Sequence, residues 1–169
     1  MRIGFGQFSK ATPEYFRFAA QYGATDILLN KADIPGTGGR WELQDLVKLR
    51  LSAEQYGLKL TALENVPTHF YDEIMLGGDG RDRQIENMIY TVRNIAKAGI
   101  PIFGYNWMPS MVWRTTPKSI RCGAFATAFD YEEAKAMPFT HGREYFEDEM
   151  WQNLEYWINI ITPIAEEEG

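Results

Sequence analysis

Four glycines divide the chain into repeating units, and this repeat constrains the fold more than any other feature of the sequence. Gly23, Gly57, Gly99 and Gly169 each follow a helix-like stretch. Glycine is favoured there because a left-handed residue closes a helix and a Cβ would clash. A short, mostly apolar segment follows the first three glycines, and a further one opens the chain, as is typical of parallel strands buried on both faces. The predicted strands are residues 2–8, 24–30, 58–66 and 100–107.

Helices are predicted between these strands. The clearest spans residues 81–98, where apolar side chains recur at steps of three and four, and a similar pattern spans about 147–168. The first helix has Thr12 as its N-cap and Pro13 at its first position, where the missing N–H costs nothing. Another helix covers about residues 42–56. The predicted order is therefore four strands, each followed by a helix.

This order fits either a closed barrel or a doubly wound sheet, because crossovers between parallel strands are right-handed in both. A dinucleotide-binding sheet would carry a G-x-G-x-x-G turn after its first strand, and no such turn is present. We therefore predict an α/β fold of parallel (β/α) units from a TIM barrel. About four of the eight units are present, so residues 1–169 are expected to form the N-terminal half of one (β/α)8 domain that continues beyond Gly169.

Composition narrows the classes of partner. Seventeen basic and 23 acidic residues give a formal charge of -6, and the basic residues are scattered, so nucleic acid is not expected as a partner. No apolar run reaches the roughly 18 residues that span a bilayer, and the first residues begin a strand rather than a signal peptide. We expect a cytoplasmic protein without membrane contact. The single cysteine, Cys122, is assigned no role.

Residues 108–146 are too many for an ordinary connection between a strand and a helix. This segment follows the carboxyl end of the fourth strand, and in barrels that end carries the active site. We predict that it is a long βα loop over the active-site face. The polar or aromatic residues expected to converge on this face are Asn30, Asp33, Glu64, Asn65, His69, Asn106, Trp113 and Arg114.

Each of these candidates has a functional and a structural interpretation. Glu64 and His69 are the candidates for catalysis. Glu64 could act as a base or support the reacting groups from a distance, but a carboxylate at a barrel rim also forms salt bridges to neighbouring loops. His69 could act as an acid or a base, but a lone histidine also anchors loops. Asn106, Trp113 and Arg114 are the candidates for substrate binding. A guanidinium matches a carboxylate in bidentate fashion, and a neighbouring tryptophan offers a flat apolar wall. His141 is interpreted as a surface residue.

Five stretches of the sequence resemble the mannonate dehydratase family. Residues 81–87 and 93–100 resemble its R-D-x-x-I-E-N and R-N-x-A-x-A-G-I patterns, and residues 64–69 its E-S-V-P-x-H. Residues 105–109, Y-N-W-M-P, resemble its Y-N-F-M-P, and residues 153–156 its N-L-E-Y helix. The matches follow in order over nearly the whole chain.

The resemblance implies a xylose-isomerase-like barrel that dehydrates D-mannonate to 2-dehydro-3-deoxy-D-gluconate in hexuronate breakdown. It further implies a divalent metal, Mn2+ or Fe2+, held by His, Cys, His and Asp of later strands. On this basis no metal ligand is expected in this chain, no metal is expected to bind the fragment, and the fragment is expected to be inactive alone. The spacing of its His, Cys, Asp and Glu residues likewise matches no metal site.

The sequence also departs from the family. Residues 112–116, V-W-R-T-T, stand where the family has D-W-T-R-T, and residues 2–8 differ from its aromatic opening. Two alternatives therefore remain: a sugar isomerase or epimerase of the same barrel class, and a half-barrel without catalytic activity. Four units leave the first and last strands unpaired, so we expect the chain to form a homo-oligomer.

Overall fold

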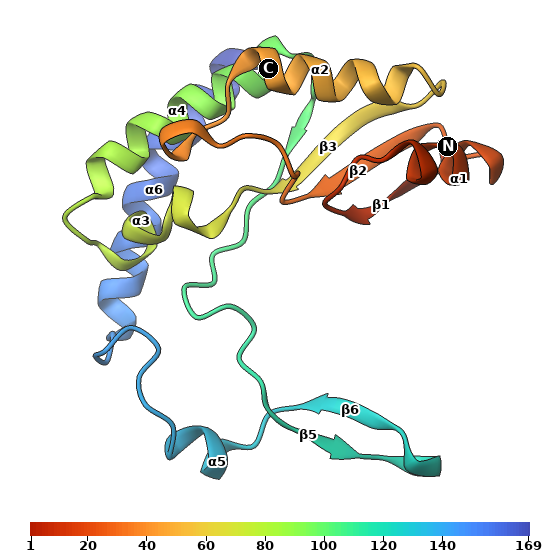
Figure 1. Ribbon diagram of the computed structural model, residues 1–169. Helices are drawn as coiled ribbons and strands as arrows, with labels where there is room; N and C mark the ends of the chain where they lie inside the picture. The colour runs from red at the N-terminus through yellow and green to blue at the C-terminus, as the bar shows by residue number, and fades with distance from the viewer.

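Four parallel strands form one sheet in the order β1-β2-β3-β4 in the computed structural model, which describes residues 1–169 (Figure 1). Each strand pairs in parallel with the next strand along the chain, and β1 and β4 have a neighbour on one side only. The predicted alternation of strands and helices is confirmed. The elements are β1 Gly4–Phe8, α1 Pro13–Gln21, β2 Asp26–Asn30, α2 Leu43–Glu54, β3 Lys59–Asn65, α3 Asp72–Leu76, α4 Arg81–Lys97, β4 Ile102–Phe103, β5 Thr115–Ser119, β6 Phe125–Ala128, α5 Tyr131–Lys135 and α6 Glu147–Glu168, with 3-10 turns at Thr37–Gly39, Thr68–Phe70 and Arg121–Gly123.

The helix ends follow the local sequence signals. The hydroxyl of Thr12 accepts a hydrogen bond from the backbone N–H of Tyr15 at 3.4 Å, which caps α1. Gly23, Gly57 and Gly99 have φ values of +79°, +72° and +75°. The left-handed closure predicted from the glycines is therefore confirmed, and each helix turns directly into the following strand.

The core lies between the sheet and the helices α2, α4 and α6, which lie on the same side of the sheet in Figure 1. Its largest fully buried side chains include Trp41, Phe70 and Trp157. The loop that carries Trp41 is fixed to α4, because the hydroxyl of Thr91 accepts from the Trp41 N–H at 3.2 Å and the Asn94 amide donates to the Trp41 carbonyl at 2.9 Å. These two bonds satisfy buried backbone groups that would otherwise be costly.

Helix α6 closes the described part of the fold against α3 and α4. Trp157 is fully buried, and its indole ring stands edge-on to Tyr105 at 5.4 Å between ring centroids. The side chain of Asn153, also buried, donates to the backbone carbonyl of Met75 at 3.1 Å. None of the helices has the length and apolarity needed to cross a membrane.

The fourth strand is shorter than predicted. Residues 100–107 were expected to be a strand, but only Ile102–Phe103 pair with β3, at Ala62 and Leu63. Pro101 has no N–H to donate, and β4 has no neighbour on its outer edge that would extend the ladder. Gly104 adds one further bond, from its N–H to the Leu63 carbonyl at 2.8 Å, before the chain leaves the sheet.

The segment between β4 and α6, residues 104–146, is called the arm below. It carries a two-stranded antiparallel hairpin, β5 and β6, and the short helix α5, none of which was predicted. Only Thr115 and Ala134 of the arm are buried. In Figure 1 the hairpin and α5 extend away from the four-stranded sheet. The structure thus gives the long loop its own secondary structure, and its role as a cover for the active site stays a prediction.

Candidate functional site at the carboxyl ends of the strands

Polar side chains from the first three strands meet where these strands end. The Gln7 amide donates to Glu64 Oε1 at 3.1 Å, which links β1 to β3. The Asn65 amide donates to the Asn30 side-chain oxygen at 3.0 Å, which links β3 to β2. Because parallel strands place their carboxyl ends at one edge of a sheet, these bonds place two polar pairs at the end where barrels carry their chemistry.

A local irregularity of β1 presents Gln7 at this site. The register of β1 against β2 shifts between Gly6 and Phe8, so Gln7 lies in a bulge. The backbone φ angle of Gln7 is +67°. This lies in the left-handed region, which residues other than glycine adopt only at an energetic cost. A Cβ on Gly6 would stand 2.8 Å from the Leu28 Cβ, so only glycine allows this close approach of β1 to β2.

Two acceptor oxygens at the site have no partner. Glu64 Oε2 and Asn65 Oδ1 are buried and make no hydrogen bond within the protein. Buried acceptors without a partner are costly and rare in folded proteins. Because both groups accept hydrogen bonds, they suit a ligand that carries several hydroxyl groups.

The loop after β3 is held by one buried amide. The Gln84 side chain donates to the His69 carbonyl at 3.1 Å and to the Asp72 carboxylate at 2.6 Å, and accepts from the Ile74 N–H at 3.2 Å. In the same loop the hydroxyl of Tyr71 donates to the Asn106 carbonyl at 2.9 Å, and burial raises the pKa of this phenol. The loop is thus tied both to α4 and to the start of the arm.

His69, Asn106 and Asp33 lie near this end of the sheet but are not joined to the four linked residues. The His69 side chain is exposed and stands edge-on to Phe70 at 5.0 Å. The Asn106 side chain is exposed, while its carbonyl is the group fixed by Tyr71. Asp33 is exposed, and its N–H donates to the Ser9 carbonyl. Catalysis by His69 or Glu64 stays a prediction.

Trp113 and Arg114 lie on the arm, directly before β5. Both are exposed, and Trp113 stands edge-on to Phe129 of the arm at 6.2 Å. The structure does not join either residue to Glu64 or to the asparagine pair, although the sequence analysis expected all of them to converge. Their role in substrate binding, with that of Asn106, stays a prediction.

The arm has its own network of charged groups. Lys118 donates to Asp130 at 2.6 Å, and Glu133 accepts from the Thr116 N–H at 2.9 Å, so β5 is bound to the start of α5. The hydrogen bond from Lys118 lowers the pKa of Asp130, and the bond from the Thr116 hydroxyl lowers the pKa of Glu133. His141 also belongs to the arm, with Nε2 3.0 Å from the Pro109 carbonyl oxygen.

The residues of this chain do not fit a transition-metal site. No three His, Cys, Asp or Glu side chains lie close enough to hold a metal ion. The linked residues at the strand ends are one carboxylate, Glu64, and three amides, and no imidazole joins them, whereas iron sites commonly combine imidazole with a carboxylate. The single cysteine, Cys122, is exposed on the arm.

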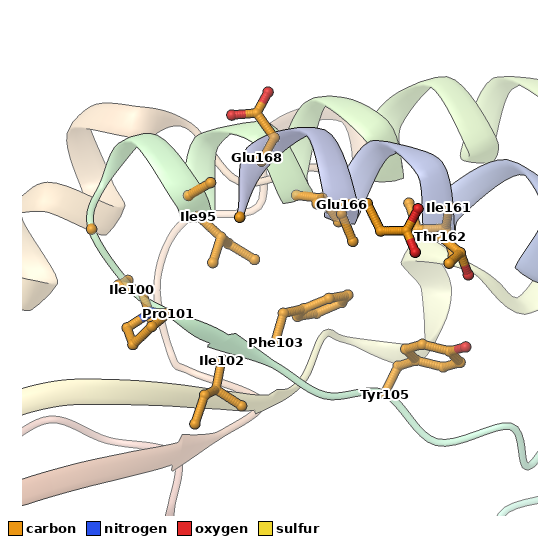
Figure 2. A pocket seen from close by; sticks show the side chains of 15 residues that line it. Ile95, Ile100, Pro101, Ile102, Phe103, Tyr105, Ile161, Thr162, Glu166 and Glu168 are labelled. Atoms are coloured by element: carbon orange, nitrogen blue, oxygen red, sulfur yellow. The ribbon is translucent and has the colours of Figure 1, made fainter.

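A mainly apolar cavity lies apart from this site. It has a volume of about 730 Å³ and lies between β4 and α6, and none of the predicted site residues lines it. Figure 2 shows Phe103 and Tyr105 extending toward α6 beside Ile161, whereas Ile102 points away from that helix. The cavity is mainly apolar, so we place the polar chemistry at the strand ends and treat the cavity as a packing surface.

Gln7 was missed in the sequence analysis. Its contact with Glu64 joins residues 57 positions apart, and periodicity does not reveal such a pairing. The local sequence did contain a signal for Gln7. A glycine inside a strand often marks a bulge, and Gln7 is the polar residue that follows Gly6 near the end of an apolar strand. Tyr71 was missed for a different reason, since only the fold brings it to the Asn106 carbonyl.

The chain is similar to mannonate dehydratases over its full length. It is 31% identical to the enzyme of Streptococcus suis (strain 05ZYH33), covering all of this chain and 53% of that protein. It is 30% identical to the enzyme of Streptococcus pneumoniae (strain 70585) with the same coverage. The crystal structure of mannonate dehydratase from Streptococcus suis serotype 2 superposes with a TM-score of 0.78 at 30% identity, over all of this chain and 51% of that one.

A second solved structure shares the fold alone. D-psicose 3-epimerase from Clostridium cellulolyticum H10 superposes with a TM-score of 0.57 at 12% identity, over all of this chain and 50% of that one. The chain thus spans about half the length of the proteins it matches. Its four parallel (β/α) units are half of a TIM barrel, which confirms the predicted fold class. The model of the D-mannonate dehydratase family matches residues 1–142, and the chain therefore belongs to that family.

Proposed function

We propose that the complete protein removes water from D-mannonate to give 2-dehydro-3-deoxy-D-gluconate, a step of hexuronate breakdown in the cytoplasm, and that this chain supplies part of its substrate site. The observation that carries the proposal is the match of the family model over residues 1–142. The two unpartnered acceptors, Glu64 Oε2 and Asn65 Oδ1, support it because a sugar acid carries a row of hydroxyl groups that can donate to them.

The dehydration step requires two proton transfers, and a tautomerisation follows it. A base takes the proton from C2, and an acid protonates the C3 hydroxyl group, which leaves as water. The resulting enol gains a proton at C3 and loses the proton of its C2 hydroxyl group, which gives the 2-keto product. Negative charge develops beside the substrate carboxylate, so a cation is needed there. We propose that Mn2+ or Fe2+ serves in the complete protein, with ligands from outside this chain.

For this chain we propose binding and orientation. Glu64, held at Oε1 by Gln7, would accept from a substrate hydroxyl through Oε2, and Asn65 would accept from a neighbouring hydroxyl. Arg114 and Asn106 would bind the carboxylate end with Trp113 beside them, which requires the arm to approach the strand ends. Buried polar groups of this kind select against ligands that lack the matching hydroxyl.

The proposal is tested with two proteins, the chain of residues 1–169 alone and a hybrid in which it replaces the matching half of the Streptococcus suis enzyme. Each is incubated with Mn2+ and D-mannonate, and release of the 2-keto acid is measured. We expect product from the hybrid and none from the chain alone. D-altronate, D-gluconate and an aldose serve as comparison substrates.

The outcomes separate the alternatives. A folded hybrid that dehydrates another sugar acid but not D-mannonate would contradict the proposed substrate. A folded hybrid that interconverts an aldose and a ketose would favour an isomerase or epimerase. Turnover by the chain alone, above a blank without protein, would contradict the view that groups outside residues 1–169 are required. Circular dichroism of the hybrid confirms that it is folded.

A further inference from the structure

The first part of the arm, residues 105–114, is called the stem below. It runs from β4 to the hairpin without forming a helix or a strand (Figure 1). The last hydrogen bond to the sheet before the stem is the one from Gly104 to the Leu63 carbonyl. The stem carries the three residues for which substrate binding is proposed, Asn106, Trp113 and Arg114. Their positions relative to Glu64 therefore depend on the contacts that hold the stem beyond the sheet.

Two contacts from the loop after β3 hold the stem. The Tyr71 hydroxyl donates to the Asn106 carbonyl at 2.9 Å, and the Thr68 hydroxyl lies 3.9 Å from the sulfur of Met111. The first is a hydrogen bond of ordinary length to a strong acceptor, whereas a thioether sulfur is a weak acceptor. No other hydrogen bond links residues 105–114 to the sheet, α3, α4 or α6. Tyr71 is therefore the main polar anchor of the stem.

Tyr71 is itself held in place by the core. Its side chain is only 3% exposed, and burial raises the pKa of its phenol, so the hydroxyl is a donor at neutral pH. The residues around it are fixed by Gln84, which donates to the His69 carbonyl at 3.1 Å and to Asp72 at 2.6 Å. Gln84 is buried and belongs to α4. A helix of the core thus determines where the phenol lies.

The loop also has a short, packed path to the polar residues at the end of β3. Tyr71 stands six positions after Asn65. Val66 and Phe70, which lie between them, are fully buried, and Phe70 stands edge-on to Trp41 at 5.8 Å. Close-packed segments of this kind move little relative to the strand that they follow. The phenol therefore fixes the Asn106 carbonyl relative to β3.

We propose that Tyr71 is a positioning residue of the substrate site. Through the Asn106 carbonyl it holds the Asn106 side chain at the carboxyl ends of the strands, where the amide binds the acid end of the substrate. This role rests on the proposed function, because it takes a sugar acid as the substrate. Tyr71 does not touch the substrate, and its effect is on affinity. Binding that is equally strong in the ground state and the transition state changes the Michaelis constant and leaves the turnover number unchanged.

The substitution Tyr71→Phe removes the anchor with little other change. The phenyl ring keeps the buried packing of the tyrosine. Asn106 is exposed, so water can replace the phenol as the donor to its carbonyl. We therefore expect the variant to fold and to lose the fixed position of the stem. A tyrosine that served stability alone would leave the Michaelis constant unchanged when it is replaced.

Steady-state kinetics of the hybrid enzyme with Mn2+ and D-mannonate tests this role. Tyr71→Phe should raise the Michaelis constant about threefold to tenfold, as expected for one lost hydrogen bond, with the turnover number within about twofold of wild type. The matched control is Tyr156→Phe, which removes a hydroxyl group that donates to Asp82 at 3.1 Å, between α6 and α4. The control should match wild type in both constants. Circular dichroism confirms that each variant is folded.

A double variant identifies the path of the effect. When Asn106→Ala is already present, Tyr71→Phe should change the Michaelis constant by less than about 1.5-fold, because the amide that the phenol positions is absent. Three results overturn the assignment of Tyr71. They are an unchanged Michaelis constant in Tyr71→Phe, a fall in turnover number alone, and a full effect of Tyr71→Phe that persists without the Asn106 side chain.

Hydrogen exchange without substrate separates this inference from the proposed function. Amides of residues 104–111 should exchange faster in Tyr71→Phe than in wild type and in Tyr156→Phe, while those of β3 and α4 stay unchanged. Equal exchange in the three proteins overturns the positioning role even in an active hybrid. A folded wild-type hybrid that leaves D-mannonate unchanged contradicts the proposed function, and with it the part of this inference that concerns the substrate.

Discussion

The bulge at Gln7 provides a stability test that separates backbone strain from a side-chain hydrogen bond. Gln7 has a φ of +67° and donates to Glu64 at 3.1 Å. Gln7→Ala removes the bond and keeps the left-handed conformation. Gln7→Gly removes the bond and also relieves the conformation, because glycine adopts positive φ readily. The two variants therefore differ in stability only through the conformational free energy of the backbone at position 7.

Three free-energy contributions set the expected stabilities. Loss of the exposed hydrogen bond should cost about 0.5–1 kcal/mol in either variant. Relief of the left-handed conformation should return about 1–2 kcal/mol to the glycine variant, while the greater freedom of its unfolded chain removes about 0.5–1 kcal/mol. We expect Gln7→Ala to be less stable than wild type by about 0.5–1 kcal/mol, and Gln7→Gly to be close to wild type.

Urea unfolding followed by circular dichroism measures this difference, provided that the slope with denaturant is equal in the three proteins. A glycine variant that is no more stable than the alanine variant would show that position 7 carries no backbone strain. In the hybrid enzyme both variants should raise the Michaelis constant equally, because both release Glu64. If only one variant does so, Gln7 does not act through this hydrogen bond.

Three further predictions follow from the arm and from α6. In the hybrid, Arg114→Ala should raise the Michaelis constant at least about tenfold through the lost charged hydrogen bonds, whereas Arg121→Ala, another exposed arginine of the arm, should leave it unchanged; equal values for both would contradict the assignment. Asn153→Ala should lower the free energy of unfolding by about 1–3 kcal/mol, since it leaves a buried carbonyl without a donor; a loss below about 0.5 kcal/mol in urea unfolding would contradict it. Because Lys118 lowers the pKa of Asp130, this pair stabilises the arm above the ordinary carboxyl pKa of about 4 and the gain is lost as the pH falls through the lowered value. Hydrogen-exchange protection of β5 and β6 should therefore fall in acid, and the difference between wild type and Asp130→Asn should vanish there; a difference that persists in acid would refute the role of this pair.

The alternation of strands and helices could be predicted because its signals are local. Glycine closures and helical periodicity depend on neighbouring residues, and α1, α2, α4 and α6 begin and end within a few residues of the predicted positions. Strand β4 could not be bounded in this way. Its length depends on whether a strand lies at its outer edge, and this information is not contained in residues 100–107.

The candidate site was predictable in its location but only partly in its members. Parallel strands place their ends together, so Asn30, Glu64 and Asn65 were expected at one edge and lie there. Trp113 and Arg114 were placed from their position along the chain, and they lie directly before the hairpin of the arm. A short antiparallel hairpin of mixed polar and apolar residues has no strong periodic signal, so the path of the arm could not be deduced.

The sparse burial of the arm has a consequence for how this protein can diverge. A substitution in the sheet or in α4 changes close packing and is restricted by stability, whereas most positions between β4 and α6 contact solvent. Insertions, deletions and exchanges there remove little buried surface. Selection can therefore reshape this segment over many generations while the sheet stays nearly constant, and related enzymes should differ most in length and composition within the arm.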